Sequence, residues 1–175
     1  LKTILDTLNA LFKIGRRYDT EWATFWRTIG HRDPTGTMAL IESYGSDTDW
    51  YKGAVNRVLT EWSSQQPEAA MQWLEANKVL TGEDFDQAAR ALISGFAARD
   101  LEAATDYAMK VFKPKEKGSG SLFQLLTSTA LQQRGMDGMI AWFHAMPNGP
   151  AKVGLFNSVA NRLQEIDPDK KRAWL

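Results

Sequence analysis

The triplet His31-Arg32-Asp33 has the residue order of a protein-kinase catalytic loop, so it is the first candidate for chemistry. In that loop the Asp accepts the proton of a substrate hydroxyl, and an Asn five residues later holds a metal ion. Met38 stands at the Asn position here, and no Asp-Phe-Gly motif follows. We interpret Asp33 instead as the N-cap of a helix that begins at Pro34.

Metal-ligand patterns are also incomplete. Glu83, Asp84 and Asp86 cluster before an expected helix, but the alternating ligands, Gly and later Glu of a calcium loop are missing. Their charge suits the positive end of that helix. His31 and His144 are not in a His-Glu-x-x-His motif, and the chain has no Cys. We therefore expect no metal ligands and no cofactor.

Serines in this chain lack the settings that activate a nucleophile. Gly118, Ser119, Gly120 and Ser121 follow several lysines, but the Gly-Lys-Ser/Thr core of a phosphate-binding loop is absent. We interpret residues 114–121 as a linker. No serine has the Gly-x-Ser-x-Gly context of a hydrolase. We expect no catalytic residues, and we expect that this chain is not an enzyme.

The stretch 55–76 is typical of two helices joined by a tight turn. Its first half places apolar residues at helical spacing, so they form one stripe: Val55, Val58, Leu59 and Trp62. Pro67 suits the first position of a second helix, because it has no N–H to donate. Two short helices cannot bury these stripes alone, so the unit requires similar neighbours.

Versions of this unit recur when the turn is used as the anchor. The anchors are spaced by 32 to 35 residues: Pro34, Pro67, Leu101, Met136 and Pro168. Six residues after each anchor the side chain is large and apolar: Leu40, Trp73, Tyr107, Trp142 and Trp174. Asp precedes the anchor in three copies, where its carboxylate can cap the second helix: Asp33, Asp100 and Asp167.

The period predicts the fold. Repeats of about 34 residues with two helices each are typical of α-solenoids. We predict an all-α protein, a right-handed superhelix of about five hairpins with turns near 33–34, 66–67, 100–101, 135–136 and 167–168. We expect one domain over residues 1–175, cut from a longer protein, with residues 1–15 forming a second helix. Packing explains most tryptophans, and Trp22 and Trp50 are the least constrained.

Charge limits the partners. Lys plus Arg and Asp plus Glu both number 21, which argues against a general polyanion binder. The charge is uneven, because residues 41–108 carry 12 acids and 5 bases whereas residues 109–175 carry 5 acids and 10 bases. No apolar run approaches the ~20 residues of a membrane-spanning helix, so we expect no membrane insertion.

The pattern of a large residue, then Asp-Pro and a later Trp, as in Leu163, Asp167-Pro168 and Trp174, resembles bacterial helical repeats of the tetratricopeptide-like superfamily. The resemblance implies a solenoid, protein binding and an exported or envelope-associated location. The chain departs from the tetratricopeptide consensus, since Asn56-Arg57 and Thr60 replace its Leu-Gly pair and Tyr. The peptide-clamp residues of that family therefore cannot be transferred.

Three functions remain open. The first is a protein–protein interaction scaffold that binds a peptide or a partner helix in a concave groove. Its lining would come from first-helix residues off the apolar stripe: Arg27, Asn56, Arg57, Thr60, Glu61, Arg90, Ser94, Asn157 and Asn161. The second is a helical accessory region of a larger enzyme. The third is an RNA-binding repeat, which the neutral charge disfavours. Open repeats at the two ends would allow end-to-end self-association.

Overall fold

The computed structural model describes residues 3, 6–7, 10, 19–112 and 119–175. Within these residues the chain consists of helices and their connections, without a strand, which confirms the all-α class. The helices are α2 Asp19–Arg32, α3 Pro34–Ser43, α4 Tyr51–Gln65, α5 Pro67–Ala76, α6 Glu83–Arg99, α7 Leu101–Val111, α8 Ser119–Ala145, α9 Pro150–Ile166 and α10 Pro168–Trp174. None of these helices is both long and apolar enough to cross a membrane.

Helix α8 contains a sharp break at Gly135, where φ is 69° and ψ is −175°. Glycine tolerates this left-handed φ because it has no Cβ. The break divides α8 into residues 119–134 and 136–145, so the described helices form successive pairs. We call α2, α4, α6, residues 119–134 and α9 the first helices. The second helices are α3, α5, α7, residues 136–145 and α10.

Three aspartates begin second helices as the sequence predicts. The carboxylate of Asp33 accepts from the backbone N–H of Gly36, and Asp100 and Asp167 bond the equivalent N–H groups three residues on. Gln66 provides no such side-chain bond before α5. Asp33 is thus a helix cap, and this confirms the interpretation that replaced the kinase motif.

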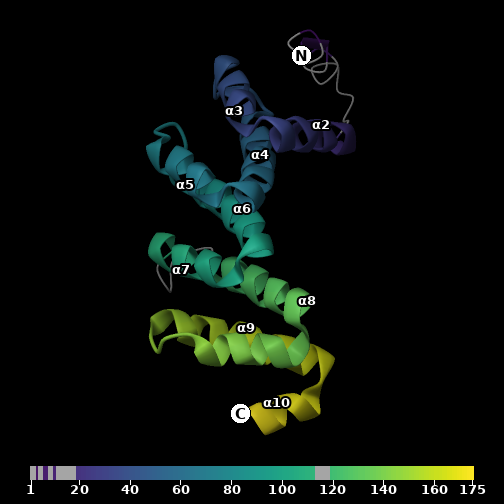
Figure 1. Ribbon diagram of the computed structural model, residues 1–175, viewed down its shortest axis with the longest axis vertical. Helices are drawn as coiled ribbons and strands as arrows, with labels where there is room; N and C mark the ends of the chain where they lie inside the picture. The colour runs from purple at the N-terminus through teal and green to yellow at the C-terminus, as the bar shows by residue number, and fades with distance from the viewer. Residues whose placement is uncertain (1–2, 4–5, 8–9, 11–18, 113–118) are drawn as a thin grey trace.

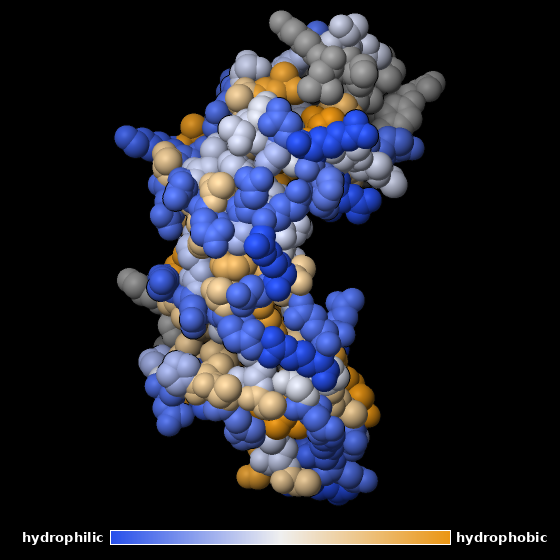
Figure 2. Space-filling view, in the orientation of Figure 1, coloured by the Kyte–Doolittle hydropathy of each residue, from blue (hydrophilic) through white to orange (hydrophobic). Residues whose placement is uncertain are grey.

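The first helices follow one another along the molecule (Figure 1). Helix α2 packs on α4, α4 on α6, α6 on α8, and α8 on α9. The second helices α3, α5 and α7 each lie against their own first helix and against the next one. The resulting body is elongated, and its outline is indented at the level of α6 (Figure 2).

A glycine lets α4 and α6 approach closely. A Cβ at Gly95 would lie 1.9 Å from the carbonyl oxygen of Thr60 and 2.3 Å from the hydroxyl of Ser63. The Thr60 hydroxyl lies 3.1 Å from the carbonyl oxygen of Ala91 and donates to it across the same contact. The position therefore excludes any side chain.

Side chains of one first helix also cap the end of the preceding one. Gln65 donates to the carbonyl of His31, Arg99 to that of Gln65, and Gln133 to that of Ala97 at 2.9 Å. The last carbonyls of a helix have no partner within the helix, so these bonds satisfy groups that would otherwise need water. The same pattern at these three steps fixes the offset between the first four first helices.

The tryptophans correct one sequence interpretation. Trp50 is 3% exposed, and its ring stacks on Trp26 with centroids 5.3 Å apart. Trp22 meets both rings edge-on, so Trp50 is a core residue and Trp22 is a partly buried residue held against it, and neither is weakly constrained. Trp73 is likewise only partly buried against the core. The repeat alignment could not show this cluster, because Trp50 precedes α4 and belongs to no repeating column.

Two predicted segments lie partly outside the described residues. The helix expected over residues 1–15 lies mostly outside the described residues. Residues 113–118 of the expected linker also lie outside them. The end of that linker is corrected, because residues 119–121 belong to α8.

The two tryptophan environments predict different stabilities. Trp26→Ala should cost about 3–5 kcal/mol of the free energy of unfolding, because the ring is fully buried. Trp73→Ala should cost clearly less, since part of its ring already contacts water. Denaturant unfolding of both variants measures the difference, and equal losses would contradict this assignment of the core.

The approach of α4 and α6 predicts opposite effects for two Gly→Ala changes. Gly95→Ala should destabilise by about 1–3 kcal/mol, because its new methyl group collides with the backbone of Thr60. Gly53→Ala, also in a helix but open to solvent, should stabilise by roughly 0.5–1 kcal/mol. Thermal unfolding distinguishes them, and a stable Gly95→Ala variant would show that the helices are farther apart.

Candidate functional site

Equivalent positions of the successive pairs form a column along the first helices. It lies seven residues before the start of each second helix and is occupied by Arg27, Thr60, Ser94, Thr129 and Asn161. Arg27 and Asn161 are exposed, whereas the other three are half-buried. We call the surface that follows this column the first-helix face. The two hollows described next contain only first-helix residues.

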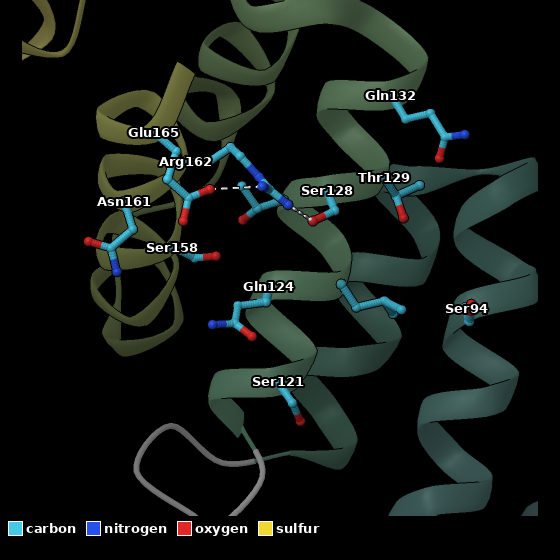
Figure 3. Close-up of a pocket in the computed structure, with 12 residues that line it drawn as sticks. Ser94, Ser121, Gln124, Ser128, Thr129, Gln132, Ser158, Asn161, Arg162 and Glu165 are labelled. Atoms are coloured by element: carbon cyan, nitrogen blue, oxygen red, sulfur yellow. Dashed lines mark hydrogen bonds and ion pairs between the residues drawn. The ribbon is translucent and has the colours of Figure 1, made fainter. Parts of the chain in front are cut away.

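The larger hollow, the polar hollow, lies between α6, α8 and α9 and has a volume of about 670 Å³ (Figure 3). Hydroxyl and amide groups dominate its lining, which is Ser94, Ser121, Gln124, Leu125, Thr127, Ser128, Thr129, Gln132, Ser158, Asn161, Arg162 and Glu165. Arg162 bonds Ser128 Oγ at 2.8 Å and Glu165 Oε2 at 2.8 Å, so its charge is balanced within the hollow. The hollow is therefore rich in neutral hydrogen-bonding groups.

A local change in the apolar stripe creates this hollow. Ser128 occupies the position that holds the fully buried Leu59 and Ile93 in the two preceding pairs. Gln124, one turn earlier, is exposed where Val55 is buried. Polar groups at these places favour contact with water, so α8 packs less closely on α6 than α6 packs on α4.

One hydroxyl in the hollow has no partner. Thr127 is 1% exposed, and its Oγ1 makes no hydrogen bond with the described residues. Other helical threonines such as Thr105 bond the carbonyl four residues earlier. An unpaired buried hydroxyl costs about 1–3 kcal/mol of the free energy of unfolding.

The smaller hollow, the arginine hollow, lies between α2 and α4 and measures about 380 Å³. Its lining is Thr20, Ala23, Thr24, Arg27 and Arg57. Arg27 also borders a neighbouring hollow with Thr28, His31, Arg32 and Glu61. The Glu61 carboxylate lies 3.9 Å from Arg27 Nε and 3.8 Å from His31 Nδ1, so neither contact is a close ion pair.

The structure brings five of the nine predicted groove residues to these hollows. Arg27 and Arg57 line the arginine hollow, and Glu61 borders its neighbour. Ser94 and Asn161 line the polar hollow.

The other four predicted residues lie elsewhere. The Thr60 hydroxyl is engaged between α4 and α6, and the Arg90 guanidinium lies over the Phe112 ring at 5.7 Å. Asn56 is half-buried and Asn157 is exposed, and neither lines the two named hollows.

Sequence reasoning missed most of the polar hollow. Gln124, Ser128 and Gln132 recur every four residues on one side of α8, opposite Ser158 and Arg162 of α9. The sequence signal for this hollow is that Gln124 and Ser128 replace apolar residues at stripe positions of the fourth first helix. A search for recurring residues overlooks such an exception.

The charged clusters show no metal geometry. Among the described residues no group of three or more Asp, Glu or His side chains is placed to hold an ion. Asp84 pairs with Lys52 at 2.8 Å, and His144 Nε2 accepts from Trp174 Nε1 at 3.0 Å.

Comparison with known proteins adds no assignment. No protein-family model, curated protein or solved structure matches this chain.

Proposed function

We propose that this chain is a non-enzymatic protein–protein interaction scaffold with the architecture of a right-handed α-solenoid. It binds an extended peptide segment along its first-helix face. The observation that carries this proposal is the polar hollow. Each peptide residue offers one N–H donor and one C=O acceptor. Asn, Gln, Ser and Thr side chains can both donate and accept, so this lining can bond a main chain in either sense.

RNA suits the same hollow less well. Single-stranded RNA sites combine a positive groove with aromatic side chains on which bases stack. Arg162 is the sole cation among the residues that line the polar hollow, and Glu165 balances it. No aromatic residue lines that hollow. A neutral peptide main chain requires neither feature.

We also propose end-to-end association with a second copy of the chain. Val153 and Phe156 of α9 and Leu175, which follows α10, expose 69, 38 and 70% of their surfaces. Phe156 corresponds in the repeat to Val55 and Ala89, which are fully buried. A second copy would cover this apolar surface in the same way.

Two asparagines on α9 provide a matched test of peptide binding. Asn161 lines the polar hollow, whereas Asn157, one turn earlier, does not. Peptides selected from a displayed random 12-residue library should lose about tenfold or more in affinity for Asn161→Leu, because their main-chain groups lose a partner. Asn157→Leu should bind like the parent chain.

Fluorescence polarisation with the selected peptides, labelled, gives these affinities, and thermal unfolding establishes that both variants fold. Equal binding by the parent chain and Asn161→Leu would count against the polar hollow. A Thr129→Leu variant provides an independent second position in the same hollow.

Self-association is tested by an exposed valine. Val153→Glu should shift the chain toward monomer, because a charge cannot be buried in an apolar contact without a partner. Val79→Glu, at a residue 55% exposed in the loop before α6, should leave the association unchanged. Sedimentation velocity over a concentration series measures both, and identical behaviour of the two variants would refute the interface.

A further inference from the structure

We propose that the bound peptide carries an oxyanion, a carboxylate or a phosphate, that binds between Arg27 and Arg57 in the arginine hollow. This inference rests on the proposed peptide-binding function and adds a requirement on the peptide sequence. It concerns the opposite end of the first-helix face from Asn161.

The guanidiniums of Arg27 and Arg57 are both available to bind an anion. Arg57 is exposed and has no ion pair or hydrogen bond within the described residues. The Arg27 side chain is 63% exposed, and the one ion pair that it makes with a described residue, Glu61, is 3.9 Å long. That separation is too long for a hydrogen bond, so the described residues leave the donors of Arg27 unused.

The chemistry of the arginine hollow favours an oxyanion. Two like charges that line one hollow repel each other, and an anion between them removes this repulsion. A guanidinium presents its N–H groups in a planar fork that matches the oxygens of carboxylate and phosphate. The remaining lining, Thr20, Ala23 and Thr24, is small and leaves space for such a group.

The surrounding acidic residues limit the size of the anion. Glu61 lies beside Arg27, and residues 41–108 carry a net charge of −7. A polyanion laid along α4 and α6 would be repelled by these acids. A single anionic side chain that enters between Arg27 and Arg57 would not be.

The distance between the arginine hollow and the polar hollow matches the length of a short peptide. Arg27 and Asn161 occupy the same column, four first helices apart. Packed helix axes are roughly 8–10 Å apart, so the column spans about 32–40 Å. An extended chain rises roughly 3.3 Å per residue, so about 10–12 residues cover that distance. One short peptide can therefore occupy both hollows.

The test uses the displayed random 12-residue library as its probe, with selections on the parent chain, on Arg57→Gln and on Lys78→Gln. Lys78 is an exposed lysine in the loop between α5 and α6 and serves as the control. Clones selected on the parent chain and on Lys78→Gln should be enriched in Asp or Glu at one end. Clones selected on Arg57→Gln should lose this enrichment.

A peptide swap then measures the contact. The best peptide is synthesised with Glu, phosphoserine or Gln at the enriched position. The Gln form should bind the parent chain about tenfold more weakly than the Glu form, and the three forms should bind Arg57→Gln within about twofold of one another. The ratio of Glu to phosphoserine affinities shows which oxyanion the hollow prefers.

The outcomes separate this inference from the function on which it depends. Peptides that require Asn161 but show no acidic preference would overturn the oxyanion site and leave the scaffold intact. An acidic preference that persists in Arg57→Gln would also overturn it. A library that yields no binder above background would contradict both proposals.

Discussion

The packing of each first helix on the next is the interaction on which the rest of this structure depends. The hairpins are short, and the apolar stripe of α4 becomes a core only when α6 covers it. Gly95 makes that contact close, and the bonds from Gln65 and Arg99 to the preceding helix fix its offset. The second helices then lie in the positions left to them, against two successive first helices.

This constraint also explains where a ligand can bind. Where the stripe of a first helix is apolar throughout, the next first helix packs closely on it, as α6 does on α4. At α8 the stripe includes Ser128, with Gln124 and Gln132 one turn to either side, and the surface stays open. The chain gives up buried apolar area at this point, and the unpaired hydroxyl of Thr127 adds to that cost.

The sequence predicted the helical class, the Asp caps and the helix breaks well because these depend on local rules. Asp33, Asp100 and Asp167 act on N–H groups three residues away. The sites depend on long-range geometry, which the sequence does not show directly. Thr60 and Arg90 had suitable residue types, yet Thr60 bonds α6 and Arg90 lies over Phe112. The aromatic cluster around Trp50 was missed because Trp50 lies outside the repeating columns.

A peptide that runs along the first-helix face should perturb that face alone. Chemical-shift mapping by NMR, with a library-selected peptide titrated into the isotope-labelled chain, shows which helices it contacts. We expect the shifted amides to lie on α2, α4, α6, residues 119–134 and α9, with the largest changes near Ser94, Thr129 and Asn161. Shifts confined to the second helices α3, α5 and α7 would contradict it.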